Sequence, residues 1–237
     1  MLIDTALDLG LDAGGRDPDL YSNTLKQYHK QLWSKELPSG KLFKLSDSIT
    51  GKYLTFENGL DSIELGSDSI ANSYAASSSA QILKIVAEIE QEMVESFRKL
   101  NNTIGAFIIF PSSRINNKMT INGARGFNSK IADRFDLTLE CIRRHYLGDS
   151  SPLSEVLNRY SNFFSLFQSF NGYVEFFLLK DLVDKTERVK FFISQRNPFD
   201  GNGYPRNSSE YLEYRSNSME WVAKRNAQVA SLNSHKF

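Results

Sequence analysis

Residues 120–146, TINGARGFNSKIADRFDLTLECIRRHY, hold the side chains of this sequence whose types and spacing best suit chemistry. Arg125 lies between two glycines, which allow positive φ and close approach to a ligand, and a following asparagine or serine can cap the next helix. A helix N-terminus presents free N–H groups and partial positive charge, so it attracts phosphate or carboxylate. We therefore predict an anion site at residues 123–130. Its expected ligand-binding residues are Arg125, Gly126, Asn128, Lys130 and, on the following helix, Arg144.

The same stretch also suits a purely structural role. It lacks the two glycine motifs that bind phosphate, G-x-x-x-x-G-K-[ST] and G-x-G-x-x-G. In this alternative it is a turn from strand to helix that needs its glycines, and Arg125 pairs with an acidic neighbour. The two interpretations differ in whether the guanidinium of Arg125 points to a ligand or to a carboxylate of its own chain.

The helix expected after this turn has one apolar stripe. Its buried residues are Ile131, Phe135, Leu139 or Thr138, Ile142 and Tyr146. Charged residues share the other face, where Asp136 and Glu140 stand four residues apart. Like charges at this spacing cost an exposed helix about 0.2–0.5 kcal/mol, so we expect cations beside them. Arg144 follows Glu140 by four residues, the favourable order for an ion pair within a helix.

The charged face has two interpretations. It is either a solvated, salt-bridged surface, as charge runs on helices usually are, or a functional site. In the functional interpretation, Asp136 and Glu140, with Asp133 nearby, hold a divalent cation, or Glu140 acts as a general base with His145 as its acid-base partner. His145 also suits a helix C-terminus, where the helix dipole stabilises a cationic imidazole.

The composition excludes several classes of protein. Lys and Arg together number 28, as do Asp and Glu, so no global field draws the chain to nucleic acid or to an anionic membrane. Nucleic-acid binding would need a local patch. One cysteine and three histidines exclude an internal disulfide and argue against a zinc site. The motifs H-E-x-x-H and G-x-S-x-G are absent, which argues against zinc proteases and α/β-hydrolases.

The sequence favours a soluble, cytoplasmic protein that makes no membrane contact. Its N-terminus has acidic residues where a signal peptide needs positive ones, and no apolar run approaches the roughly 18 residues that cross a bilayer. The single cysteine, Cys141, lies inside a helical pattern and is expected to be a small buried hydrophobe rather than a nucleophile.

The elements that must position these residues predict an α+β fold, predominantly helical, with a small and mainly antiparallel sheet. Helical periodicity covers residues 22–38, 77–100, 151–170, 173–183 and 209–232. Short β-rich stretches cover residues 41–45, 52–56, 62–66, 104–111, 118–122 and 188–194. Residues 1–20 are interpreted as an irregular lead-in, and residues 21–237 as a single α+β domain.

A cluster of phenylalanines is interpreted as core rather than as a platform for stacking bases, because it has helical spacing and no interleaved cations. Its members are Phe163, Phe164, Phe167, Phe170, Phe176 and Phe177. The loop at residues 195–207, rich in Gly, Asn and Pro, is a candidate for a mobile flap.

Four blocks of the sequence resemble a bacterial protein family of unknown function. The blocks are SNTLKQYHKQLWSKELPSG, INGARGFNSKIADRFDLTLECIRRHY, SPLSEVLNRYSNFFSLFQSFNGYVEFFLLKDLV and the AKRN near the C-terminus. The resemblance extends roughly from Asp17 to Asn226 and implies a soluble bacterial protein. It implies no activity, and no catalytic residue is carried over from it.

Two functional hypotheses follow. In the first, the protein binds a phosphate-bearing ligand, a nucleotide or nucleic acid, at residues 123–130 and the adjoining helix N-terminus, with phosphoester chemistry left open. In the second, it is a non-catalytic interaction or regulatory protein whose charged helix is purely structural. An open pocket around Arg125 favours the first, and burial of Arg125 against carboxylates favours the second.

Overall fold

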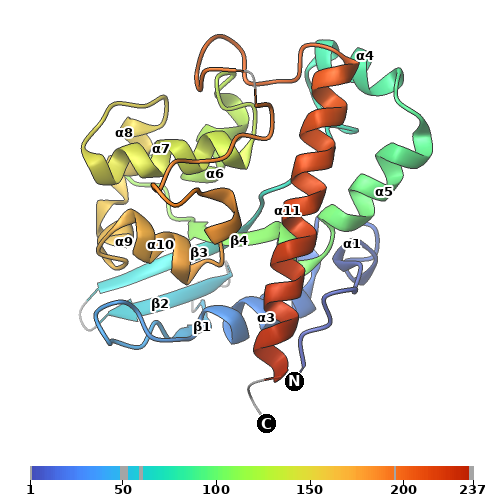
Figure 1. Cartoon of the computed structure of the whole chain (residues 1–237). Helices are drawn as coiled ribbons and strands as arrows, with labels where there is room; N and C mark the ends of the chain where they lie inside the picture. Colours follow the sequence, from blue (N-terminus) through green and yellow to red (C-terminus); the bar gives the residue numbers. More distant parts are fainter. Residues whose placement is uncertain (1, 49–52, 59–60, 195, 235–237) are drawn as a thin grey trace.

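The computed structural model describes residues 2–48, 53–58, 61–194 and 196–234. Over these residues the chain has the predicted α+β fold, mainly helical, with one small antiparallel sheet (Figure 1). Helices α6 to α10, within residues 121–176, gather on one side of the sheet and α3 (Asn23–Trp33) lies on the other, while the long helix α11 (Ser208–Ser234) runs beside both (Figure 1).

The sheet has the strand order β1-β2-β3-β4, and every neighbouring pair is antiparallel. The strands are β1 (Leu45–Asp47), β2 (Leu54–Asn58), β3 (Asp61–Ser69) and β4 (Phe107–Pro111). The register pairs Leu54 with Leu65, and Leu65 with Pro111. Every residue of β4 is buried, as expected for the apolar run at residues 104–111. These four strands lie in or beside the first four stretches predicted to be strands.

The other two predicted strands are wrong. Within residues 118–122, Thr120 is the N-cap of helix α6 (Ile121–Phe127), because its hydroxyl accepts the N–H of Gly123. Residues 188–194 form only an isolated bridge, between Val189 and Val183. Val189, Phe192 and Ile193 are buried, and the N–H groups of Phe192 and Ser194 bond to side chains instead of to a strand.

The predicted helices are correct in place but often broken. Helix α3 (Asn23–Trp33) begins after its N-cap, Ser22, whose hydroxyl accepts the N–H of Leu25. The other described helical segments, apart from α7, are α1 (Leu9–Asp12), α2 (Pro18–Tyr21), α4 (Ala80–Ala87), α5 (Gln91–Asn101), η1 (Ile104–Ala106), α8 (Ser154–Arg159), α9 (Ser161–Ser165), α10 (Phe170–Phe176), η2 (Lys180–Leu182) and α11 (Ser208–Ser234). The stretches 77–100 and 151–170 are therefore each two helices rather than one. Of the stretch 173–183, only residues 173–176 are α-helical, as the end of α10, and the short η2 follows.

The two ends of the chain also differ from the expectation. Residues 1–20 are not wholly irregular, because Asp8 and Asp17 cap α1 and α2 with their carboxylates. Helix α11 begins before the predicted residue 209 and is capped by Asn207, whose Oδ1 accepts the N–H of Glu210 at 2.9 Å. Within the described residues, no helix is both long and apolar enough to cross a membrane.

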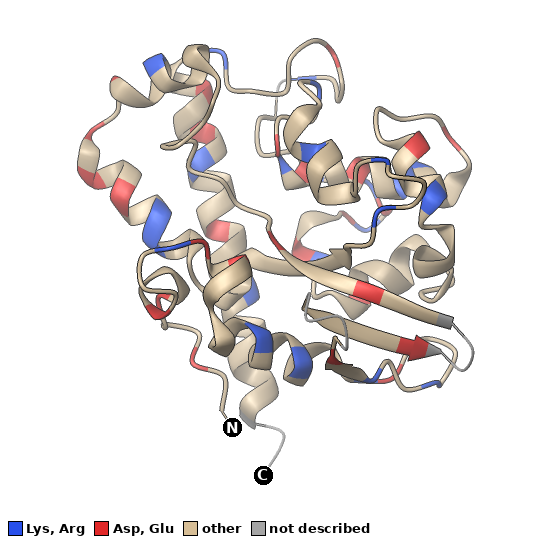
Figure 2. Ribbon diagram, turned by 180° about the vertical axis from the view of Figure 1, so that it is seen from behind, with Lys and Arg blue, Asp and Glu red and all other residues tan. Residues whose placement is uncertain are grey.

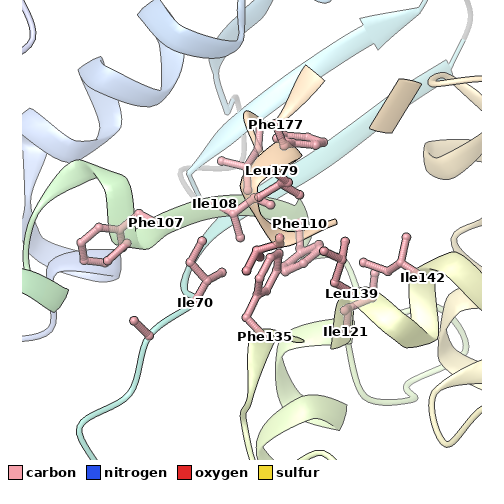
Figure 3. Packing of buried hydrophobic residues seen from close by; sticks show 14 of the residues in the cluster. Ile70, Phe107, Ile108, Phe110, Ile121, Phe135, Leu139, Ile142, Phe177 and Leu179 are labelled. Atoms are coloured by element: carbon pink, nitrogen blue, oxygen red, sulfur yellow. The ribbon is translucent and has the colours of Figure 1, made fainter. Parts of the chain in front are cut away.

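The core lies between β4 and the helices. Phe110 of β4 packs beside Phe135 and Leu139 of α7 (Phe135–Leu147), as Figure 3 shows. The six phenylalanines predicted to be core are all buried, which confirms that interpretation. Cys141 is also buried, and burial raises the pKa of its thiol to about 12, as suits a small apolar side chain.

A buried arginine of helix α11 bonds to backbone carbonyl groups of neighbouring segments. Arg225 donates to the carbonyl oxygens of Gly105, Phe107 and Phe177 at 2.7–3.2 Å. A side chain at Gly105 would meet the carbonyl oxygen of Val222 at 2.7 Å, so glycine allows the close approach of the two backbones. Figure 2 shows that basic and acidic segments are interspersed over the ribbon, in keeping with a net charge of zero.

Candidate functional site

The segment predicted to be an anion-binding loop is mostly helix. Residues 121–127 form α6, and neither Gly123 nor Gly126 has a positive φ. The turn comes later, and its positive φ angles belong to Ala132 (50°) and Asp133 (57°). Helix α7 therefore begins at Phe135, well after the asparagine that was expected to cap it. The predicted glycine loop leading directly into a helix N-terminus is thus wrong.

Arg125 lies inside the protein, with none of its side chain exposed. Its Nη1 bonds to the carboxylate of Asp68, and its Nε donates to Thr138 Oγ1 at 2.9 Å. Its Nη2 lies 3.3 Å from Asp133 Oδ1. Burial acts to lower the pKa of Arg125, but the charges of Asp68 and Asp133 outweigh burial and raise it. The guanidinium therefore points to carboxylates of its own chain, inside the protein and away from the surface.

The two carboxylates proposed to hold a divalent cation are separately neutralised. Asp136 is buried, contrary to the expected exposed face, and accepts from Arg134 and from the N–H of Phe192 at 2.9 Å. Glu140 accepts from Arg143 at 2.8 and 3.0 Å and from Arg144 at 2.9 Å. Among the residues that the structure describes, no three His, Cys, Asp or Glu side chains are placed to share a metal ion.

The proposed pair of catalytic residues does not meet. Glu140 and His145 are five positions apart on α7, which places them about 140° apart around the helix. Burial acts to raise the pKa of Glu140, but hydrogen bonds from Arg143 and Arg144 dominate and lower it, so Glu140 is a weak base at neutral pH. His145 Nδ1 faces Asn158 Oδ1 at 3.1 Å, and burial lowers its pKa.

The remaining predicted residues, except Gly126, meet on the surface. Asn128, Lys130 and Arg144 line an open groove of about 560 Å³, which we call the Lys130 groove. Its other lining side chains include Ser150, Ser151 and Phe199. Gly126 is exposed on α6 and is not among the residues that line this groove. Sequence reasoning missed the two serines and Phe199, although it singled out the 195–207 loop that carries Phe199.

Arg144 is held in place at the wall of the Lys130 groove. Its Nε donates to Glu140 and its Nη1 to the carbonyl oxygen of Ser150 at 3.2 Å, while its guanidinium carbon lies 4.9 Å from the centre of the Phe199 ring. These contacts leave Nη2 without a hydrogen-bond acceptor among the described residues. Lys130 is exposed and takes part in no ion pair with the residues described. The groove thus carries positive charge that the fold does not neutralise.

A second groove, of about 570 Å³, adjoins the Lys130 groove and shares Asn128 with it. Its lining is more apolar and includes Phe127, whose side chain is one of the most exposed large hydrophobic groups described. Its charged rim is already paired, because Glu155 bonds to Lys118 at 2.7 Å and to Arg159 at 3.2 Å. This groove therefore adds apolar surface beside the Lys130 groove but little free charge.

A buried trio on α3 and β3 has residue types that suit nucleophilic catalysis. His29 Nε2 lies 3.0 Å from Ser67 Oγ, and Trp33 Nε1 donates to His29 Nδ1 at 2.9 Å. Because Nδ1 accepts, Nε2 carries the proton and donates to the serine, the reverse of what a general base does for a serine nucleophile. Burial also lowers the pKa of His29 to about 3. The trio is structural, and sequence reasoning had no signal that its members meet.

Comparison with known proteins adds one match. A family model with the description "Family of unknown function (DUF6994)" matches residues 3–229. The comparisons with curated proteins and with solved structures gave no match. The matched range contains all the blocks on which the sequence resemblance rests.

Proposed function

We propose that this chain, which belongs to the family of unknown function DUF6994, binds a phosphate-bearing anion in the Lys130 groove. Membership of this family agrees with the resemblance found in the sequence and assigns no activity. The proposal therefore depends on the chemistry of the groove itself.

The observation that carries the proposal is Lys130, an exposed cation with no ion pair among the described residues, beside Arg144 in one groove. None of the described side chains that line it is acidic. Behind the wall, the carboxylate of Glu140 is shared by Arg143 and Arg144. Charge-assisted hydrogen bonds from lysine and arginine are the strongest that a phosphate group can receive. Hydroxyl donors from Ser150 and Ser151 complete a surface suited to phosphate oxygens.

The groove fits a single phosphate group or a mononucleotide better than a long nucleic acid. Binding of duplex nucleic acid uses many cations spread along its backbone. Here two cations lie together, and along the rest of the ribbon basic and acidic residues are interspersed (Figure 2). The Arg144 guanidinium already covers one face of the Phe199 ring, so a nucleotide base cannot stack on that face. We therefore expect the phosphate contacts to supply most of the affinity.

We propose that the Lys130 groove binds its ligand without cleaving a phosphoester bond. A general acid or base must lie within hydrogen-bond reach of the reacting group. Glu140 is engaged by two arginines, and His145 contacts Asn158 and the Phe164 ring instead of the groove. The competing hypothesis is a non-catalytic protein whose charged helix is structural. The ion pairs of Asp136 and Glu140 support that part of it, because they give these two side chains of α7 a structural role.

A thermal-shift comparison of three probes tests this proposal. Inorganic pyrophosphate and ADP should each raise the Tm, because a ligand that binds only the folded state stabilises it. Adenosine, which lacks phosphate, should leave the Tm unchanged. A shift with adenosine equal to that with ADP, or no shift with either phosphate compound, would refute phosphate recognition.

A further inference from the structure

The apolar groove that adjoins the Lys130 groove is continuous with it. We call it the Phe127 groove, and its volume is about 570 Å³, which lies within the size range of small-molecule sites. Asn128 and Pro152 line both grooves, and Asn128 Nδ2 donates to the carbonyl oxygen of Pro152 at 3.2 Å. A single ligand that lies across these two residues therefore contacts both grooves.

Apolar side chains gather in the Phe127 groove. They come from α6, from α8 and from the segments just before these helices: Met119, Ala124, Phe127, Pro152, Leu153 and Val156. Phe127 is 83% exposed and Met119 is 49% exposed. Single exposed apolar residues are ordinary, whereas contiguous exposed apolar surface marks a binding groove or an interaction site. A ligand that covers these two side chains removes their apolar surface from water, which favours binding.

The charged residues that line the Phe127 groove bond to one another. Glu155 accepts from Lys118 at 2.7 Å and from Arg159 at 3.2 Å. Arg159 Nη2 also donates to the carbonyl oxygen of Met119 at 2.7 Å. The two cations outnumber the carboxylate, so the rim of this groove does not repel an anion. Apolar surface therefore adjoins the exposed Lys130, which forms no ion pair with the described residues.

We propose that the phosphate-bearing ligand of this protein carries an aliphatic chain. Its phosphate lies beside Lys130 and Arg144, and its chain lies along the Phe127 groove. This inference rests on the phosphate binding proposed above and names the group to which the phosphate is attached.

The lining of the Phe127 groove favours an aliphatic chain over a nucleotide base. A base stacks best on aromatic faces, and among the described lining residues Phe127 supplies the one aromatic ring. The polar edge of a base also needs hydrogen-bond partners, whereas the charged groups here bond to one another. A chain needs only apolar contacts, and the flexible thioether of Met119 adapts readily to its shape.

A phosphate on an aliphatic chain occurs both in soluble alkyl phosphates and in membrane lipids. The structure favours a soluble ligand. Lipid surfaces are typically bound by clusters of about four to eight cations. Here Lys130 and Arg144 are the cations of the phosphate site, and the charges of the whole chain balance.

Calorimetric titration with methyl phosphate and with hexyl phosphate tests the inference, because these two probes differ only in chain length. Burial of one methylene group strengthens binding about fourfold. Hexyl phosphate should therefore bind about tenfold more tightly than methyl phosphate, a gain that needs fewer than two fully buried methylene groups. A gain smaller than about fourfold would overturn the inference and leave phosphate binding in place. Failure of both probes to bind would refute phosphate binding as well.

Three variants locate the chain. Phe127→Ser should reduce the advantage of hexyl over methyl phosphate from about tenfold to about threefold, because it removes the exposed ring of the groove. Leu20→Ser, the control, changes a side chain on α2 that is 72% exposed and lines neither groove, and should keep the full advantage. Lys130→Ala should weaken binding of both probes by a similar factor. The full advantage in Phe127→Ser, or an equal loss in Leu20→Ser, would overturn the inference.

Sedimentation with phosphatidylcholine vesicles that contain phosphatidic acid distinguishes the two sources of ligand. The protein should stay in the supernatant, because the inference assigns a soluble alkyl phosphate. Sedimentation with these vesicles, but not with vesicles of phosphatidylcholine alone, would overturn that assignment in favour of a lipid in a bilayer.

Discussion

Arg125 of α6 and Asp68 of β3 form an ion pair that is closed off from solvent, although the two residues lie 57 positions apart in the sequence. The Arg125 side chain is 0% exposed and that of Asp68 7%. Asp133 and Thr138 take further N–H groups of the same guanidinium. The arginine that looked most suited to a ligand is thus the link between α6, the sheet and the turn before α7.

Replacing this arginine should destabilise the fold. Arg125→Met removes the cation and leaves Asp68 buried without it, and breaking a buried pair in this way typically costs about 3–5 kcal/mol. Urea unfolding should show the loss as a lower midpoint. Lys99→Ala, on exposed α5, is the control and should change the free energy of unfolding by less than about 0.5 kcal/mol. A similarly small change in Arg125→Met would mean that the pair does not hold the elements together.

Patterns within one element were predictable from the sequence, and contacts between elements were not. The burial of Phe135, Leu139 and Ile142 on α7 and the phenylalanine core follow from helical spacing. Asp68, by contrast, reaches Arg125 only because β3 lies beside α6 in the folded chain. Thr120 lies in the stretch 118–122, whose residue types predict a strand, yet its hydroxyl caps α6.

Some residues of the candidate site were likewise predictable from the sequence, and others were not. Asn128, Lys130 and Arg144 were chosen for charge and polarity near a turn, and the structure brings them into one groove. The serines and the aromatic ring that complete the groove come from loops whose packing no periodicity describes. The burial of Asp136 was missed because its neighbour Phe192 is 56 positions away, and that residue's N–H bonds to the carboxylate.

Glu140 should make the protein sensitive to acid. Its pKa in the folded state lies below the ordinary value of 4.5, because Arg143 and Arg144 hold it ionised against the effect of burial. Its stabilising contribution is therefore present above the unfolded pKa and is lost as the pH falls through the folded pKa. Between about pH 6 and about pH 3, the wild type should lose more stability than Glu140→Gln in urea titrations. Glu92→Gln, on exposed α5, serves as the control and should follow the wild type; identical slopes for all three proteins would contradict the role of Glu140.

Asp19 should have the opposite effect to Glu140 and make the protein less stable as the pH rises. Burial raises the pKa of its carboxyl to about 7, although Ser67 and Arg125 oppose the rise, and one carboxyl oxygen has no partner among the described residues. A raised folded pKa gives stability that is full below the unfolded value of 3.8 and is lost as the pH rises towards about 7. Asp19→Asn should remove this loss, so that its stability relative to the wild type increases over that range. Parallel pH curves for the two proteins would show that Asp19 titrates normally.

Calorimetric titration of ADP into the wild type, Lys130→Ala and Lys99→Ala tests the phosphate proposal most directly. Lys130 is the exposed cation of the groove, and Lys99 is an exposed cation on α5, which lies across α11 from α6 and α7 (Figure 1). Lys130→Ala should weaken binding about tenfold at low salt, with Kd rising further at high salt, and Lys99→Ala should bind like the wild type. Unchanged affinity in Lys130→Ala, or an equal loss in both variants, would contradict phosphate binding at the Lys130 groove.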